Sequence, residues 1–166
     1  MYYKDDREWA DKLNPLIKKI IKENLGNKLK KTIEIRDATE KEDKEEATDM
    51  VITADGKDFR MAVRTRRTYE SRDFGDITIR SSRTSGAITE LKKIKEGKVS
   101  YYFYCWGKNG IENLEWLIVD IKKMNYWALF LERKEIPNKD DATFFISVPI
   151  LDIKHYGCVV ASNLLN

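Results

Sequence analysis

Cysteine and histidine are scarce in this sequence of 166 residues, which contains two cysteines and one histidine. Cys105 and Cys158 form no CxxC pair, and a structural zinc site needs about four cysteine or histidine ligands. The composition therefore argues against structural zinc. A Ser-His or Cys-His nucleophile would have to use His155, which no supporting motif accompanies, so a structural role is the better interpretation of this histidine.

Long apolar runs and a leader peptide are also missing. The longest apolar runs, residues 126–131 and 146–151, fall far short of the ~18 residues of a membrane-spanning helix. The first residues carry early acids instead of the apolar segment of a signal peptide. We therefore expect a soluble, cytoplasmic protein without membrane contact.

Glycine is sparse as well, and the eight glycines form neither GxGxxG nor GxxxxGK[ST]. A doubly wound nucleotide-binding sheet usually carries a glycine-rich first turn and alternates strand and helix throughout, so that class is excluded. The length and the 42% hydrophobic content fit a single domain, residues 1–166, with a real core.

The order of patterns predicts a mixed α/β (α+β) fold with a central sheet flanked by helices. A helix is expected over residues 5–25, starting or breaking near Pro15, and an Asp55-Gly56 step predicts a hairpin. A second helix is expected from Ser85-Gly86 to Glu96. Strands are expected over residues 31–36, 47–53, 58–66, 76–80, 99–106, 114–121 and 143–148, a further helix over 124–133, and the residues after Pro149 are left unplaced.

The net charge of +3 conceals two opposed segments. Residues 37–49 hold seven acids and two lysines, whereas residues 57–98 hold twelve basic and six acidic residues. Seven of the ten arginines lie between Arg60 and Arg83. Because the planar guanidinium fork suits phosphate and carboxylate better than lysine does, this concentration favours an anion-binding role.

Strand alternation sharpens that interpretation. Arg60, Arg64 and Arg66 should share one face of the strand over residues 58–66, opposite a core face that includes Met61 and Val63. Two interpretations stay open: an exposed sheet face whose arginines pair with the acids of residues 37–49, or a nucleic-acid-binding surface. The residues proposed to bind nucleic acid are Arg60, Arg64, Arg66, Arg67, Arg80, Arg83 and Ser85.

Ser85 belongs to this set because the segment Arg83-Thr84-Ser85-Gly86 is expected to open a helix, where hydroxyl and backbone N–H groups can hold phosphate. Aromatic residues are the other candidate contacts, since the strand over residues 99–106 is aromatic on both faces and bases can stack on such rings. A core role is the simpler interpretation for that strand, and likewise for Trp116, Tyr126 and Trp127.

The order of helix, Asp-bearing strand, hairpin, polar second strand, third strand, helix and aromatic strand resembles the core of the PD-(D/E)XK nuclease superfamily. The resemblance covers residues 5–106, leaving residues 107–166 as a C-terminal extension, and it implies a restriction-endonuclease-like fold. It matches Asp49 to the metal-binding Asp of that superfamily and places Arg64-Thr65-Arg66 where E-x-K is expected. Mg²⁺ at Asp49 and a catalytic pair of Asp49 and Arg66 are what the resemblance implies.

The departure lies at the E-x-K position, because arginine cannot coordinate Mg²⁺, which takes oxygen ligands. A migrated carboxylate, at Asp58, Glu8 or Glu23, could restore the metal site; alternatively the fold and its basic groove persist without cleavage. Arg64 beside Asp49 favours the second possibility, because the arginine would neutralise that acid.

Two function classes remain. The first is a nuclease-like protein that binds DNA or RNA through the arginine-rich strand, with Mg²⁺-dependent cleavage an open question. The second is a non-enzymatic phage or mobile-element accessory protein that engages a host protein complex, for example through the acidic segment at residues 37–49. Either a monomer or a homodimer fits both classes.

Overall fold

The computed structural model describes residues 2–67, 75–107, 114–138 and 142–164, with side chains from Glu8 onward. Its elements run in the following order: α1 (Tyr2–Leu29), β1 (Ile33–Asp37), α2 (Glu40–Glu46), β2 (Met50–Ala54), β3 (Lys57–Arg67), β4 (Asp76–Arg83), α3 (Glu90–Lys95), β5 (Tyr101–Gly107), β6 (Glu115–Asp120), α4 (Ile121–Tyr126), β7 (Ile136–Pro137), β8 (Thr143–Pro149), α5 (Ile150–His155) and β9 (Val159–Ser162).

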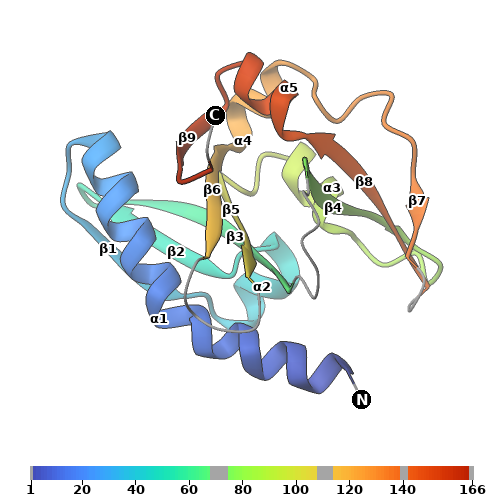
Figure 1. Ribbon diagram of the computed structural model, residues 1–166, viewed down its shortest axis with the longest axis horizontal. Coiled ribbons are helices and arrows are strands. Elements are labelled where there is room, and N and C mark those ends of the chain that lie inside the picture. The colour runs from blue at the N-terminus through green and yellow to red at the C-terminus, as the bar shows by residue number, and fades with distance from the viewer. Residues whose placement is uncertain (1, 68–74, 108–113, 139–141, 165–166) are drawn as a thin grey trace.

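The described strands form two sheets (Figure 1). The six-stranded sheet has the order β1-β2-β3-β5-β6-β9, and the three-stranded sheet has the order β4-β8-β7. In the larger sheet β3 and β5 are parallel and every other neighbouring pair is antiparallel. The fold is therefore mixed α/β in one domain, as the sequence predicts, and its α1, β1–β3 meander, α3 and parallel β5 are consistent with a restriction-endonuclease-like fold.

Helix α1 packs on one face of the six-stranded sheet (Figure 1). Trp9, Leu13, Ile17, Ile21 and Leu25 recur every four residues and are all buried. They contact inward-facing residues of β1, β2, β5 and β6 in one apolar cluster. The helix runs through Pro15 without interruption, contrary to the expected break, and the proline ring lies on the exposed side of the helix.

The opposite face of the large sheet is covered by the three-stranded sheet together with α3, α4 and α5. A second apolar cluster joins Tyr102 and Tyr104 of β5 to Ile77 and Ile79 of β4, and it includes Leu91 of α3. Both faces of β5 are therefore buried, which confirms the core interpretation of its aromatic residues. Within the described ranges, no helix is both long enough and apolar enough to cross a membrane.

The hairpin between β2 and β3 forms at the predicted dipeptide. Asp55 and Gly56 both have positive φ, at 49° and 70°, as a two-residue hairpin turn requires, and they leave Ala54 opposite Lys57. The strand expected after the hairpin does not join the hairpin in one sheet, because residues 76–80 belong to β4 in the smaller sheet. The third strand beside the hairpin is instead β1, which precedes it in the chain and pairs with β2.

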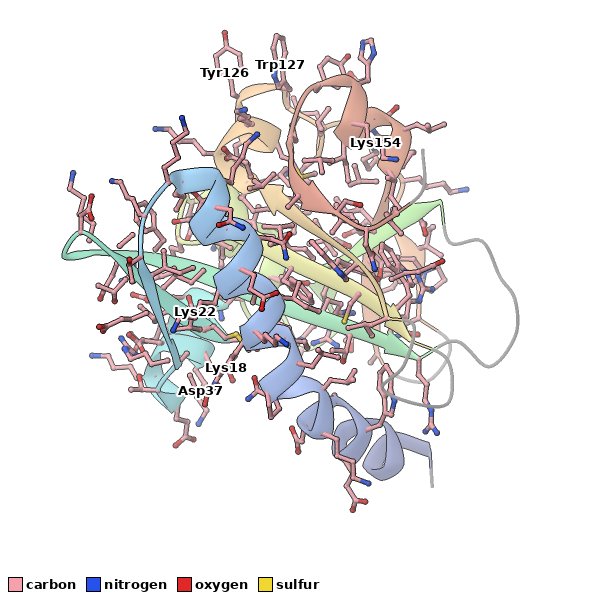
Figure 2. All side chains as sticks on the ribbon, turned by 60° about the vertical axis from the view of Figure 1, so that its left-hand side comes forward. Lys18, Lys22, Asp37, Tyr126, Trp127 and Lys154 are labelled. Atoms are coloured by element: carbon pink, nitrogen blue, oxygen red, sulfur yellow. The ribbon has the colours of Figure 1, made fainter. Side chains whose placement is uncertain are left out.

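Three local predictions are wrong. The second helix begins at Glu90, with Thr89 at its N-cap, because the chain from Ser85 onward first makes a turn with Gly86 at φ 71°. The helix expected over residues 124–133 instead spans Ile121–Tyr126. Tyr126 and Trp127 are 79% and 48% exposed and project from the α4 end of the molecule, so they do not belong to the core (Figure 2).

Candidate nucleic-acid interface

The arginine-bearing face of β3 lies between the two sheets. Ala62 is buried in the cluster shared with β4 and β5, and Arg64 pairs with Tyr104 in the parallel register of β3 and β5. The expectation of an open sheet face is therefore wrong, because apolar residues of β4 and α3 cover this side of β3. Arg64 and Arg66 are half-buried at the edge of that cover.

A cleft of about 570 Å³ opens where the C-terminal end of β3 emerges from between the sheets. Among the described residues, its lining contains four arginines. The lining residues are Trp9, Val63, Arg64, Thr65, Arg66, Arg67, Thr78, Arg80, Tyr104, Asn138, Thr143, Phe144 and Phe145. We call this the arginine cleft. The structure thus brings together Arg64, Arg66, Arg67 and Arg80, as the charge pattern of the sequence led us to expect.

Several contacts organise the cleft walls. The guanidinium of Arg67 lies 5.9 Å from the ring centroid of Trp9, a cation–π geometry that connects β3 to α1. Arg66 lies 3.9 Å from the carboxylate of Asp76 at the start of β4. The hydroxyls of Thr78 and Tyr104 are 2.9 Å apart in the interior, so the two sheets are joined by a hydrogen bond at this point.

A smaller pocket of about 190 Å³ adjoins the arginine cleft and shares Arg64 and Arg80 with it. Asp49, Glu90 and Arg83 also line this pocket. Glu90 accepts a hydrogen bond of 2.9 Å from the Tyr102 hydroxyl and one of 3.1 Å from the backbone N–H of Arg80. This carboxylate therefore connects α3 to strands of both sheets.

Arg64 is electrostatically fixed between acids and tyrosines. Burial acts to lower its pKa, but Tyr102 and Glu90, followed by Tyr104 and Asp49, more than offset this, and the net pKa is raised. Arg64 therefore stays charged at every pH at which the protein is folded. No ion pair within 4.0 Å joins it to Asp49 in the described part of the chain, so the two groups interact without direct contact.

Asp49 precedes β2 and is held by the backbone. Its carboxylate accepts a 2.7 Å hydrogen bond from the Val63 N–H, and its own N–H donates to the Met61 carbonyl at 3.0 Å. Asp49 is exposed to solvent, although protein atoms surround much of its carboxyl group. Burial raises its pKa to about 6; Asp43 and Glu90 add to this effect, while the Val63 N–H and Arg64 oppose it.

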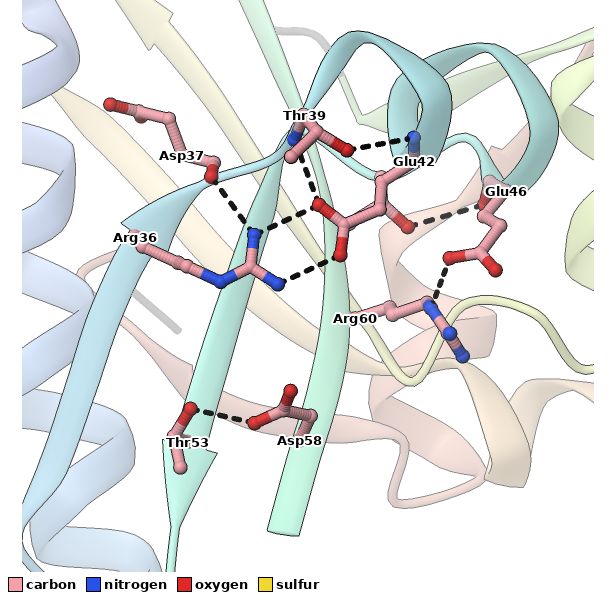
Figure 3. Close-up of polar contacts among 9 residues, drawn as sticks. Arg36, Asp37, Thr39, Glu42, Glu46, Thr53, Asp58 and Arg60 are labelled. Carbon is pink, nitrogen blue, oxygen red and sulfur yellow. Dashed lines mark hydrogen bonds and ion pairs between the residues drawn. The ribbon is translucent and has the colours of Figure 1, made fainter. Parts of the chain in front are cut away.

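Asp49 has acidic neighbours in both pockets that it lines, Asp11 and Asp37 in one and Asp43 and Glu90 in the other. No group of three acidic, histidine or cysteine side chains positioned for a metal exists among the described residues. Asp58, one suggested replacement, accepts a hydrogen bond from Thr53 near the turn of the hairpin, at the end opposite Asp49 (Figure 3). Glu8 and Glu23 are exposed on α1 and line no pocket with Asp49.

Arg60 and Ser85 lie apart from the cleft. Arg60 forms an ion pair with Glu46 of α2, and Arg36 makes a two-pronged contact with Glu42 at 2.7 and 2.8 Å (Figure 3). Ion pairs between arginines and the acidic segment therefore do form, and those found among the described residues involve Arg36 and Arg60. Ser85 is exposed in the turn after β4, and the helix-start reason for including it does not hold.

Sequence reasoning missed three contributors to the site: Trp9, Phe145 and Glu90. Trp9 follows the apolar spacing of α1, and Phe145 lies in an expected strand, so neither pattern signals a role in a site. Glu90 sits at the helix start that was placed too early. The only available signal for Glu90 was the Thr89-Glu90-Leu91 sequence, in which a capping residue precedes an acid in the first turn.

Gly107 allows Trp9 to reach the cleft. A Cβ at this position would lie 2.6 Å from Trp9 Cζ2, closer than Cβ atoms approach in folded proteins, and 3.2 Å from Leu114 Cδ1, which is a tight contact. We expect Gly107→Ala to displace the indole and to destabilise the fold by about 2 kcal/mol. Denaturant unfolding and tryptophan fluorescence would measure both effects; Gly75→Ala, where a Cβ meets nothing within 4 Å, is the matched control.

These features define a mixed α/β protein with an arginine-lined cleft between two sheets. No protein-family profile matches the chain, and no curated protein is similar to it. Among solved structures, the chain is similar to a Holliday junction resolvase, Hjc, of Archaeoglobus fulgidus, with 6% identity and a TM-score of 0.34 over 85% of this chain and 97% of that one. A likeness this distant assigns no function.

Proposed function

We propose that the protein binds nucleic acid, with phosphate groups contacted by the arginines of the arginine cleft. The observation that carries this proposal is the convergence of Arg64, Arg66, Arg67 and Arg80 on one cleft that aromatic residues also line. Guanidinium groups bind phosphate through paired, charge-assisted hydrogen bonds. Binding of this kind is largely independent of sequence and weakens as salt rises.

Binding in the cleft requires no divalent metal. Arg64 stands where the superfamily resemblance expects a glutamate, and the described residues form no group of three side chains positioned for a metal. The assignment of Asp49 and Arg66 as a catalytic pair remains a prediction from that resemblance. We therefore propose a nucleic-acid-binding protein and assign it no cleavage step.

The test is a salt titration of oligonucleotide binding followed by fluorescence anisotropy. Replacing Arg66 and Arg67 together by alanine should weaken binding at least tenfold at low salt. Because two phosphate contacts are lost, the slope of log affinity against log salt should fall by about 1.4 on a single strand or about 1.8 on a duplex. Affinity in EDTA and in Mg²⁺ should agree.

The matched control removes two exposed lysines of α1, Lys19 and Lys22, so that the net charge changes equally while the cleft stays intact. This variant should keep most of the affinity and the salt slope of the wild type. Equal losses in both variants would show that the overall charge is responsible, not the cleft, and absence of binding by the wild-type protein at low salt would refute the proposed function.

Binding to another protein is the second candidate, favoured by one observation. Tyr126, Trp127 and Tyr156 form an exposed aromatic cluster, with ring centroids 5.0 and 5.3 Å apart (Figure 2). The acidic segment is a weaker candidate for the protein-binding surface, because Glu40, Glu42 and Glu46 already form ion pairs with neighbouring cations. The oligonucleotide titration separates the candidates, since Tyr126→Ala should leave nucleic-acid binding unchanged.

A further inference from the structure

We propose, on the basis of the proposed function, that the arginine cleft takes an unpaired nucleotide of a single strand. Its base would lie against Phe145 and its phosphate against the cleft arginines. The preference for a single strand over a duplex comes from where the aromatic groups lie relative to the arginines.

Phe145 shares its side of the smaller sheet with an arginine. In the antiparallel register of β4 and β8 it lies directly opposite Arg80, and opposite residues of such a pair project to the same face. Both residues line the cleft, and the phenyl ring is half-buried there. An aromatic ring beside a guanidinium is the combination by which proteins hold the base and the phosphate of a single strand.

Trp9 adds a second aromatic group at the cleft. Its side chain lines the cleft, and the guanidinium of Arg67 lies 5.9 Å from its ring centroid. An aromatic ring and a guanidinium therefore adjoin at two places in the cleft, Trp9 with Arg67 and Phe145 with Arg80.

The recessed position of Phe145 selects an unpaired base. Bases within a duplex are stacked on both sides, and a protein ring contacts a base face only when that base has left the stack. A duplex could place its phosphate rows across the mouth of the cleft, but it could not bring a base to a ring lying between two sheets. A flexible single strand can do both.

The experiment compares wild type and Phe145→Leu in binding a labelled oligonucleotide, as a single strand and as its duplex. We expect the wild-type protein to bind the single strand at least tenfold more tightly. Phe145→Leu keeps apolar volume but removes the ring, and it should lower single-strand affinity about tenfold. Duplex affinity should stay within twofold, and Phe145→Trp should restore single-strand binding.

A measurement without any variant guards against misfolding of the altered protein. An abasic strand with the same phosphates should bind the wild-type protein about tenfold more weakly than the ordinary strand. Equal affinity for abasic and ordinary strands, or unchanged single-strand affinity in folded Phe145→Leu, overturns the inference. If single strand and duplex bind equally and the Arg66/Arg67 variant weakens both, the proposed function holds and the preference for a single strand is refuted. If neither form binds, both the proposed function and this inference are refuted.

Discussion

Replacing Arg64 by methionine is expected to lower the free energy of unfolding by about 2 kcal/mol and the melting temperature by roughly 6 °C. Glu90 and Asp49 both lie within electrostatic reach of this guanidinium, and methionine removes its compensating charge. The effect should be smaller than the ~3–5 kcal/mol of a fully buried pair, because Arg64 is half-buried. Thermal and urea unfolding would measure it.

A double-mutant cycle with Glu90→Gln tests whether charge, and not lost packing, is responsible. Glutamine can still accept a hydrogen bond from Tyr102 or from the Arg80 N–H, but it carries no charge. The double variant should be about 1 kcal/mol more stable than the sum of the single effects predicts. Simple additivity would show that Arg64 and Glu90 are not coupled and would contradict this view of the site.

Replacing Asp49 by asparagine is expected to change how stability and binding depend on pH. The pKa of Asp49 is about 6 in the folded protein and near 3.8 when the chain is unfolded, so the folded state holds the proton more tightly. The resulting stabilisation is fully present below pH 3.8 and is lost as pH rises through 6. Asp49→Asn should remove this decline and exceed the wild type in stability above pH 6.

Binding should respond in the same direction, because protonation of Asp49 removes a negative charge beside Arg64. Wild-type affinity for an oligonucleotide should rise as pH falls from 7.5 to 5.5, and Asp49→Asn should bind about tenfold more tightly at pH 7.5 with a flatter profile. His155, the one histidine of the sequence, lies on α5 and is not among the described residues that line the arginine cleft. His155→Gln should therefore keep the wild-type profile; its loss would assign the pH dependence to the histidine.

The sequence predicts well those features that neighbouring residues determine. The four-residue spacing of α1, the Asp55-Gly56 turn and the alternating residues of β1, β3 and β8 all form as expected, because helix periodicity, turn conformation and strand alternation are local. The concentration of arginine in the sequence also points to β3, and four of these arginines line one cleft in the structure.

Long-range pairing is what the sequence could not supply. No local pattern in residues 76–83 indicates that β4 belongs to the smaller sheet and pairs with β8. That pairing forms the second wall of the cleft. For the same reason Phe145 could not be placed opposite Arg80. The exposure of Trp127 was unpredictable in a similar way, because tryptophan is usually buried and only the position of α4 at the end of the molecule leaves it in solvent.

The pairing of β4 with β8 also sets when the site can exist. Contacts between strands far apart in the chain are slow to form, because a long loop must close before they contribute. During synthesis the ribosome releases β3 and its arginines well before β8. The arginines of β3 are therefore made before the wall that carries Phe145. The discrimination that we propose between single and paired strands requires that this last wall has docked.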